Sequence, residues 1–417
     1  MNRTNINGIH ATALGLLISF LLIRPCIEAA EWNRFLGPHQ NGTLERSSLP
    51  DHWPDEGPQQ LWRRSVGSGF AGPIVVNGQV VLFQREKNQE KIDTFNAKSG
   101  SPGWSFSYPT TYRDDFGFDN GPRSTPTADG DFLYTYGAQG RLQCLNVKTG
   151  DPVWHVDCKD KFGAPKGFFG IACSPLVDGD LVLVNVGSPT EGGIVAFDRL
   201  TGAVKWTVST DAASYSSPVI AQIESERLAL FFDREGLKTI ELPSGILRSQ
   251  YPWRPRINAS VNAASPVIKG SQVFLTTSYN QGAIVLDLSG SQAEKIWSND
   301  DALSCHYGTP VRHDDYLYGF HGRQEFGAAL HCVSWSTGKV MWRENNVAIG
   351  TLMLLGGKLL ILQENGELVL ARATPDQYQE LDRAQILNRG VRAYPAYTDG
   401  VIYARSPDRL VAFQVGK

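Results

Sequence analysis

TPTADGDFLYTYGAQGRLQCLNVKTGDPVWHV, residues 125–156, is the stretch that decides the fold of this chain. It contains four short β-like runs, which Asp129-Gly130, Gly137 to Gly140 and Thr149-Gly150 separate. Strand-sized apolar runs punctuated by Gly, Asp and Asn are typical of antiparallel hairpins. The stretch therefore predicts one sheet of four antiparallel strands.

The same pattern recurs along nearly the whole chain. Each copy opens on a Pro and a turn pair such as Asn77-Gly78, and the clearest copies close on Ser or Thr, Gly, and a Trp four residues later. The opening prolines are Pro73, Pro126, Pro175, Pro218, Pro266, Pro310 and Pro395. Their spacings run from 43 to 53 residues, with one gap of 85 that is two units long and holds the turn pair Gly356-Gly357. Eight such units predict an all-β fold, an eight-bladed β-propeller of four-stranded antiparallel blades.

The two ends of the repeat region predict how the ring closes. Counting on from Pro395 places the eighth Trp beyond Lys417, so the last blade lacks its outer strand. The unassigned run Gln60–Val66, which carries Trp62, has the character of that strand. We expect it to complete the last blade and remove an open sheet edge, which makes residues 61–417 a single propeller.

The repeated tryptophans are predicted to hold adjacent blades together. A Trp at a fixed repeat position is expected to pack between blades and to donate its N–H to a backbone carbonyl of the neighbour, rather than to stack on a ligand. The tryptophans concerned are Trp62, Trp104, Trp154, Trp206, Trp297 and Trp342.

The segment before the repeats predicts export. The apolar run Ala11–Ile23 follows a short region with Arg3 and is followed by Ala29-Ala30, the form of a cleaved signal peptide over residues 1–30. The run is too short to span a bilayer comfortably, although an uncleaved anchor is the alternative. We expect a lead-in segment at 31–60, no transmembrane segment after cleavage, and a location in the periplasm, the cell envelope or outside the cell.

Charge and cysteines exclude several classes of protein. With 39 Lys and Arg against 42 Asp and Glu, the formal net charge is −3, which excludes a nucleic-acid-binding protein. The six cysteines include no CxxC pair and no zinc-like His/Cys spacing. Cys158 and Cys173 bracket one loop between units, so they could form a disulfide in an oxidising compartment, with two separate buried thiols as the alternative.

The unit Ala196-Phe-Asp-Arg-Leu-Thr-Gly-Ala-Val-Lys-Trp206 closely resembles the tryptophan-docking repeat of pyrroloquinoline quinone (PQQ) proteins, and residues 144–154 and 332–342 fit it too. Eight copies with a closing strand resemble the quinoprotein alcohol dehydrogenase-like propeller over nearly all of the mature chain. The lead-in Trp32–Pro38 is similar to the N-terminus of secreted PQQ-like repeat proteins of planctomycete-type bacteria. The resemblance implies the fold, but this fold serves PQQ dehydrogenases, the assembly lipoprotein BamB and sensor domains of membrane kinases alike.

The chain departs from the active dehydrogenases of that family. No two cysteines are adjacent, the loops are short, the haem-attachment signature CxxCH is absent, and the family's calcium ligands have no clear counterparts here. These departures favour a non-catalytic binding or scaffold module with no bound cofactor, a monomer that takes a protein partner or a small molecule at the propeller mouth. A PQQ- and calcium-dependent oxidoreductase acting on alcohols or sugars is the alternative.

The candidate site lies at one mouth of the central channel, where the segments before the innermost strands of all blades converge. Their aromatic, basic, amide and acidic side chains predict a funnel that could bind a ligand. The candidates are Arg113, Asp115, Asp119, Arg123, Phe168, Phe169, Tyr215, Asn262, His306, Tyr307, Arg392 and Tyr394. Asp115 and Asp119 could ligate a hard cation, or act as a base with Arg123 or Arg392 as an anion clamp. The alternative is that all of these residues line a water-filled channel or a docking rim.

Overall fold

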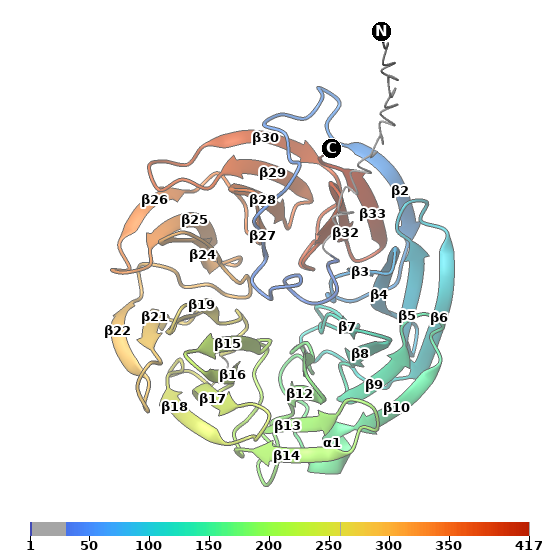
Figure 1. Cartoon of the computed structure of the whole chain (residues 1–417), viewed down its shortest axis with the longest axis vertical. Helices are drawn as coiled ribbons and strands as arrows, with labels where there is room; N and C mark the ends of the chain where they lie inside the picture. Colours follow the sequence, from blue (N-terminus) through green and yellow to red (C-terminus); the bar gives the residue numbers. More distant parts are fainter. Residues whose placement is uncertain (2–30, 259, 417) are drawn as a thin grey trace.

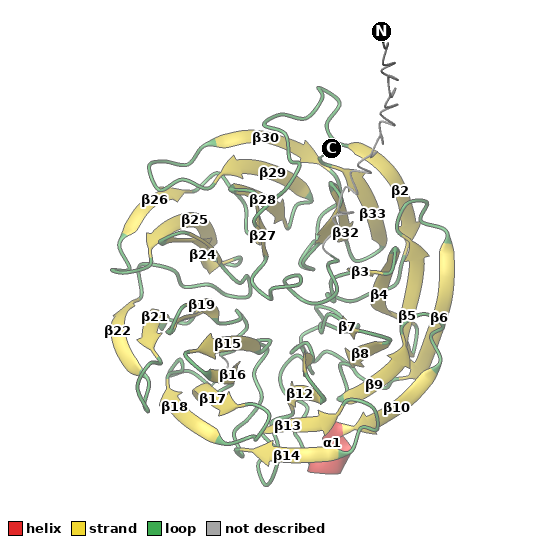
Figure 2. Ribbon diagram, viewed as in Figure 1, coloured by secondary structure: helices red, strands yellow, loops and turns green. Residues whose placement is uncertain are grey.

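In the computed structural model, which describes Met1, residues 31–258 and residues 260–416, the chain forms eight sheets arranged in a ring around one axis (Figures 1 and 2). Seven sheets have four antiparallel strands, and the eighth adds one short parallel strand to such a set. The eight-bladed β-propeller predicted from the repeats is confirmed. The predicted signal peptide falls almost wholly on residues 2–30, outside the described part of the chain.

Blades 1 to 4 follow one another along the chain. Blade 1 consists of β3 (Ile74–Val76), β4 (Gln79–Glu86), β5 (Gln89–Asn96) and β6 (Pro102–Pro109). Blade 2 consists of β7 (Thr127–Asp129), β8 (Phe132–Tyr136), β9 (Arg141–Asn146) and β10 (Pro152–Asp157). Blade 3 consists of β11 (Leu176–Asp178), β12 (Leu181–Asn185), β13 (Ile194–Asp198) and β14 (Val204–Val208). Blade 4 consists of β15 (Val219–Ile223), β16 (Glu226–Phe232), β17 (Gly236–Glu241) and β18 (Leu247–Pro252).

Blades 5 to 8 complete the ring. Blade 5 consists of β19 (Val267–Lys269), β20 (Gln272–Thr277), β21 (Gly282–Asp287) and β22 (Glu294–Asn299). Blade 6 consists of β23 (Val311–His313), β24 (Tyr316–Arg323), β25 (Gly327–Ser334) and β26 (Val340–Glu344). Blade 7 consists of β27 (Gly350–Leu355), β28 (Lys358–Gln363), β29 (Glu367–Arg372) and β30 (Glu380–Gln385), with β1 (Thr43–Leu44) parallel to β27. Blade 8 consists of β31 (Ala396–Thr398), β32 (Val401–Arg405), β33 (Arg409–Gln414) and β2 (Gln59–Ser65).

The ring closes through the N-terminal strand. β2 pairs antiparallel with β33, with Trp62 opposite Ala412 and Ser65 opposite Arg409. The predicted closure is confirmed, and the outer edge of blade 8 is supplied by a strand more than 300 residues away in sequence.

The turn pairs explain why the inner hairpins form. Asn77 and Gly78 link β3 to β4 with φ values of 50° and 68°. Two successive positive φ values define the type I′ turn, whose twist matches that of paired strands, and Asn-Gly is its preferred sequence. The Pro that opens most units precedes the innermost strand, where a lost N–H breaks no ladder.

The tryptophans and the turn glycines of adjacent blades pack against each other. Trp104 Nε1 of blade 1 donates to Val147 O of blade 2 at 3.1 Å, and its ring lies under Gly150. A Cβ on Gly150 would lie 2.4 Å from Trp104 Cε3. Gly150 also has a φ of 78°, which side chains rarely adopt. The Gly and the Trp of the repeat are therefore two halves of one contact, each made with the next copy.

The other motif tryptophans make the same hydrogen bond to the next blade around the ring. The pairs are Trp62 to Ala97 O, Trp154 to Arg199 O, Trp206 to Pro243 O, Trp297 to Trp335 O and Trp342 to Thr374 O, at 2.7 to 3.0 Å.

Two interfaces use a different donor at the same carbonyl position. Blade 4 has Ser249 where the repeat has Trp, and Arg248 Nη1 donates instead to Leu288 O of blade 5 at 2.8 Å. Between blades 7 and 8 the donor comes from the lead-in, because Trp53 Nε1 bonds Val415 O at 3.0 Å. All eight interfaces are thus bridged, and the lead-in belongs to the ring.

A belt of hydroxyl groups joins the innermost strands on the channel side. The residue before the opening Pro receives a backbone N–H from the preceding blade: Gly72 N donates to Thr125 Oγ1, Thr125 N to Ser174 Oγ, and Ser174 N to Ser217 Oγ. We call this set the hydroxyl belt; its members are Thr125, Ser174, Ser217, Ser265, Thr309 and Tyr394. Five of these hydroxyls accept a backbone N–H that no fifth strand could reach, whereas Ser265 Oγ donates to Ser217 O.

The lead-in also closes one end of the channel. Val75 N and Ala128 N donate to Trp32 O and Asn33 O, and further on Leu354 N donates to Gly42 O. The segment therefore crosses from blades 1 and 2 to blade 7 beneath the centre of the ring (Figure 1). The Ser/Thr-Gly turns lie at the end of the channel that the lead-in closes. The opposite end of the channel is open, and we call it the mouth.

The Cys158–Cys173 disulfide that the loop spacing allowed is not formed. Both residues are free and buried, and each sulfur contacts a nearby carbonyl, Val156 O and Ser174 O respectively. Burial raises the pKa of both thiols to about 12. Cys158 begins α1 (Cys158–Phe162), a short helix that was not predicted. Within residues 31–258 and 260–416, no helical segment combines the length and the apolar character that a membrane span requires.

Candidate functional site

A cavity of about 400 Å³ occupies the open mouth of the channel, and we call it the funnel. Segments before the innermost strands of blades 1 to 6 and 8 line it, together with the β20–β21 and β24–β25 hairpins and one residue of the lead-in. The lining residues are Phe35, Phe70, Phe116, Phe118, Arg123, Thr125, Phe168, Phe169, Ala172, Ser174, Tyr215, Ser217, Val261, Ala263, Tyr279, His306, Tyr307, Arg323, Gln324, Glu325, Arg392 and Tyr394.

The wall formed by blades 1 to 4 is aromatic. The ring of Phe169 lies 5.1 Å from Phe116, 6.0 Å from Phe118 and 5.8 Å from Tyr215, measured between centroids. Phe169 is also held through its backbone, because its N–H donates to Tyr215 Oη at 2.9 Å. Tilted and edge-on contacts of this kind stabilise aromatic clusters. The predicted residues Phe168, Phe169 and Tyr215 thus lie together on one wall.

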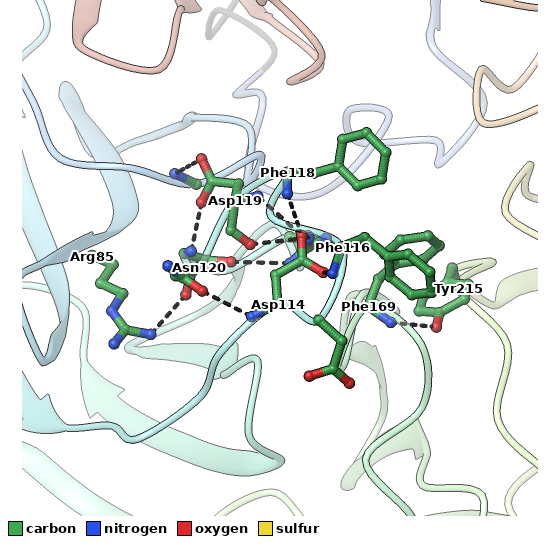
Figure 3. A network of polar contacts seen from close by, with 12 residues as sticks. Arg85, Asp114, Phe116, Phe118, Asp119, Asn120, Phe169 and Tyr215 are labelled. Carbon is green, nitrogen blue, oxygen red and sulfur yellow. Dashed lines mark hydrogen bonds and ion pairs between the residues drawn. The ribbon is translucent and has the colours of Figure 1, made fainter. Parts of the chain in front are cut away.

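The loop between β6 and β7 presents two of these rings to solvent because a buried carboxylate organises it. Asp114 Oδ2 accepts from Phe118 N at 2.8 Å and Asp119 N at 3.1 Å, while Asp114 Oδ1 accepts from Phe116 N at 3.2 Å (Figure 3). With the backbone folded around Asp114, Phe116 and Phe118 remain 55% and 53% exposed. The loop is a scaffold for two exposed rings.

The acidic residues predicted as metal ligands or bases serve this loop instead. Asp119 accepts from the backbone N–H groups of Gly69 and Gly121, and Asn120 Oδ1 accepts from Asp114 N. Asp115 is exposed and pairs with Lys166 at 2.6 Å. Neither aspartate lines the funnel, and the described residues hold no group of three His, Cys, Asp or Glu side chains that could bind a metal ion.

The two arginines predicted as anion clamps, Arg123 and Arg392, differ in the polar partners that the protein supplies to them. Arg123 donates to Asp114 Oδ2 at 3.3 Å and to Asp119 O at 3.1 Å, and its guanidinium lies over the Phe70 and Phe169 rings. Arg392 pairs with Glu364 through Nε at 2.9 Å and lies over Phe70 and Phe118. Both arginines therefore pack on the aromatic wall, and Arg392 pairs with one carboxylate through Nε alone.

The wall formed by blades 5 to 8 is polar. His306 Nδ1 lies 2.7 Å from Gln324 Oε1 and Nε2 lies 3.0 Å from Tyr279 Oη, which suits a neutral imidazole with the proton on Nδ1. Burial lowers the pKa of His306, and the charges of Arg323 and Arg392 lower it further. Tyr307 donates to Glu364 Oε1 at 2.8 Å. His306 and Tyr307 are thus fixed by partners of the protein itself.

Three of the predicted residues have other surroundings. Arg113 is exposed and lines a separate small cavity between blades 2 and 3. Asn262 is 2% exposed and bridges blades 4 and 5, because its backbone oxygen accepts from Tyr215 N and Ser216 N. Tyr394 lines the funnel, but its hydroxyl belongs to the hydroxyl belt because it accepts a hydrogen bond from Thr309 N. The centroid of its ring lies 5.0 Å from that of Phe35.

Several lining residues were not predicted. Phe116 and Phe118 lie within the acidic run 114–121, and their i, i+2 spacing was the available signal. Arg323, Gln324 and Glu325 lie in the β24–β25 hairpin, which reaches the mouth because alternate strand connections share one end of a blade. Phe35 of the lead-in carried no such signal.

The fold and this site define a propeller with a closed lower channel and an open, half-aromatic mouth. The family model described as outer membrane protein assembly factor BamB matches residues 88–344, more than half of the chain. The chain belongs to this family of PQQ-like repeat β-propellers.

Curated relatives share parts of the sequence. The chain is 31% identical to the serine/threonine-protein kinase AfsK of Streptomyces griseus over 189 residues, 43% of this chain and 21% of the kinase. It is 24% identical to the quinoprotein alcohol dehydrogenase PedH of Pseudomonas putida over 230 residues, 54% of this chain and 35% of PedH. It is 23% identical to BamB of Burkholderia pseudomallei over 282 residues, 57% of this chain and 70% of that protein. The chain therefore spans about a fifth of AfsK and about a third of PedH.

Solved structures confirm the fold. BamB from Moraxella catarrhalis superposes with a TM-score of 0.63 at 15% identity, covering 85% of this chain and 97% of BamB. A europium-containing methanol dehydrogenase superposes with a TM-score of 0.69 at 11% identity, covering 92% of this chain and 98% of the enzyme. At these identities the likeness concerns the fold alone.

The residues around the funnel do not fit a calcium-bound quinone. Calcium requires six to eight oxygen ligands. Glu325, the carboxylate in the lining of the funnel, pairs with Arg323, and the nearby Asp114 and Glu364 are engaged with backbone N–H groups, with Arg123 and with Arg392. The oxygen atoms that such a centre needs are therefore committed to holding the loops.

Proposed function

We propose that this chain is an exported, monomeric binding or scaffold module of the periplasm or cell envelope that holds a protein partner at its mouth and performs no chemistry there. The observation that carries the proposal is the rim of the funnel. Five large apolar side chains on mouth loops are exposed: Phe116, Phe118, Phe168, Ile257 and Phe326, at 55%, 53%, 36%, 50% and 82%. Apolar side chains gathered around a cavity are typical of interaction sites.

Membership of the family described by BamB supports the same function, as does the commitment of the polar groups in the funnel. His306, Tyr307 and Arg123 each have protein partners. Such groups rigidify a recognition surface, whereas a general base must be free to take a proton from its substrate.

Photo-crosslinking in the cell of origin tests the partner. A photoreactive phenylalanine analogue is placed at Phe118 or Phe326 on the mouth, and at Leu200 or Ile246 on the opposite face as matched controls that are 53% and 58% exposed. We expect a discrete crosslinked protein from the mouth positions alone. Equal crosslinking from both faces would contradict the proposal.

The oxidoreductase alternative is tested by titrating the purified protein with PQQ and Ca²⁺ and assaying alcohols and sugars with an artificial electron acceptor. We expect neither stoichiometric binding nor turnover. Tight binding with turnover would replace the proposed function by a quinoprotein dehydrogenase.

A further inference from the structure

The funnel is blind at its inner end. Phe35 of the lead-in forms part of its floor, with the Phe35 ring against Tyr394. Beneath Phe35 the channel narrows to a cavity of about 10 Å³, lined by Arg34, Leu36 and Gln40 of the same segment. That volume holds about one water molecule. A polypeptide can therefore enter the funnel but cannot pass through the ring.

The two walls of the funnel differ in character. Phe70, Phe116, Phe118 and Phe169 form the apolar side. Arg323 lies on the polar side, and Arg392 lies over Phe70 and Phe118, where the two sides meet. Arg323 pairs with Glu325 through Nε at 3.2 Å and Arg392 pairs with Glu364 through Nε at 2.9 Å. Among the described residues, none accepts a hydrogen bond from the Nη nitrogens of either arginine. Two forked donors thus line a cavity that also has an aromatic wall.

The rim carries large apolar side chains that lie outside the cavity. Phe326 is 82% exposed and Ile257 is 50% exposed, and neither side chain lines the funnel. At about 400 Å³ the cavity itself is at the small end of ligand sites. A ligand that fills the cavity and also covers these rim residues has the size of a peptide.

We propose that the funnel binds the free C-terminal end of a partner polypeptide. The last side chain, apolar or aromatic, packs on the wall of Phe116, Phe118 and Phe169, and the α-carboxylate accepts hydrogen bonds from the Nη groups of Arg323 and Arg392. The residues before it leave across Phe326 and Ile257. A chain end fits the blind floor, a carboxylate suits forked guanidinium donors, and capture of a terminal carboxylate is a known mode of peptide recognition.

This inference rests on the proposed function, because it names the part of the partner that the mouth recognises. It differs from edge-strand pairing, since no strand edge is used. It also differs from a cofactor site, since the ligand continues out of the mouth.

The test uses the purified wild-type chain and synthetic peptides labelled at their N-terminus. One peptide ends in Phe with a free carboxylate, a second is its C-terminal amide, and a third ends in Ser with a free carboxylate. Fluorescence anisotropy measures the three dissociation constants. We expect the free acid ending in Phe to bind at least about tenfold more tightly than either of the others, as loss of a charge-assisted pair predicts.

Two variants locate the carboxylate. Arg323→Gln with Arg392→Gln should reduce the affinity of the acid to that of the amide, whereas Arg323→Lys with Arg392→Lys should restore part of the preference. Arg113→Gln, on a separate cavity, is the matched control and should leave all affinities unchanged. The acid–amide comparison needs only the wild-type chain, so a variant that fails to fold does not decide the result.

Equal affinities for acid and amide, or no binding of any peptide, would overturn the inference. PQQ displacing the peptide with far higher affinity would overturn it as well. Crosslinks from Phe118 and Phe326 to internal residues of a partner would leave the proposed function in place without this inference. Absence of mouth crosslinks would remove both.

Discussion

The closed face and the mouth of the propeller are built in different ways. On the closed face, one contact repeats around the ring: a donor from one blade reaches a carbonyl beside the turn of the next, as Trp104 does with Val147. At the mouth, Asp114, Tyr215 and Glu364 each hold a different loop, and the hydroxyl belt links neighbouring blades at the inner end of the funnel. The comparison teaches that the motif contact is confined to the closed face, whereas the mouth loops differ from blade to blade and present exposed aromatic side chains.

Trp62→Ala is expected to have the largest effect on stability. Trp62 is 6% exposed, bonds Ala97 O and closes the ring, so its loss should lower the free energy of unfolding by about 3–5 kcal/mol. Denaturant unfolding followed by far-UV circular dichroism measures it. Trp62→Phe keeps most of the packing and should cost about 1–2 kcal/mol. A loss below about 1 kcal/mol for Trp62→Ala would contradict the role of the closed face.

Acid should weaken the mouth end of blade 6, because His331 there must stay neutral. His331 is 1% exposed and stacks on His321 at 4.6 Å. Burial lowers its pKa to about 4, with His321 and Arg343 adding to the effect. The unfolded chain binds this proton near pH 6.5, so stability should be complete above that pH and fall by about 1 kcal/mol per unit toward pH 4.

Unfolding at several pH values tests this titration. His331→Gln should flatten the fall, whereas His155→Gln, on an exposed strand position, should leave it unchanged. A His331→Gln variant as acid-sensitive as the wild-type chain would refute the assignment.

Gly150→Ala tests the closed face from the glycine side. The new Cβ would lie 2.4 Å from the Trp104 ring at a φ of 78°, so we expect a loss of about 2–3 kcal/mol. Gly78→Ala is the matched control, since its φ is 68° but no atom lies within 4 Å of its Cβ. It should lose only about 1 kcal/mol. Thermal unfolding compares the two, and equal losses would show that the contact with Trp104 is unimportant.

Ser174→Ala should have a smaller effect, because it removes one link of the hydroxyl belt. Thr125 N would lose its acceptor at 3.0 Å, which costs about 1–2 kcal/mol for a buried N–H group. Hydrogen exchange at Thr125 measures the effect directly. Ser174→Thr keeps the hydroxyl and should retain protection there, and protection that survives Ser174→Ala would argue against the belt.

Phe118→Ser should have the smallest effect on stability and a large one on binding. The side chain is 53% exposed, so the change in unfolding free energy should stay within about 0.5 kcal/mol. Capture of the mouth partner should nevertheless be lost. Leu200→Ser on the closed face, equally exposed, should change neither quantity. Destabilisation by Phe118→Ser would mean that the mouth also holds the ring together.

The contacts on the closed face could be predicted from the sequence because the same motif recurs in most units. The Ser/Thr-Gly-x-x-x-Trp motif carries both partners, so six donors and the closing strand could be assigned by counting. Sequence reasoning missed Arg248 and Trp53, which perform the same task from positions outside the motif. It also passed over the Ser and Thr residues before the opening prolines, whose recurrence was visible but whose acceptor role depends on a neighbouring blade.

At the mouth, counting identified the right segments but not the roles of their residues. Asp119 was a candidate metal ligand or base, and the structure places its carboxylate on backbone N–H groups. Asp114, which organises that loop, looked no different from its neighbour Asp115 in the sequence. Burial and hydrogen-bond partners decide between such roles, and both depend on which loops meet.

The sequence by itself determined the number of blades, their strand order and the closure of the ring, because a period along the chain becomes a rotation around an axis. The tertiary structure alone decided that the lead-in seals the channel with Phe35 and completes an interface with Trp53. It also decided that an aromatic wall and two arginines line the same mouth. Those features join residues hundreds of positions apart that share no repeat, so only the closed ring brings them within contact distance.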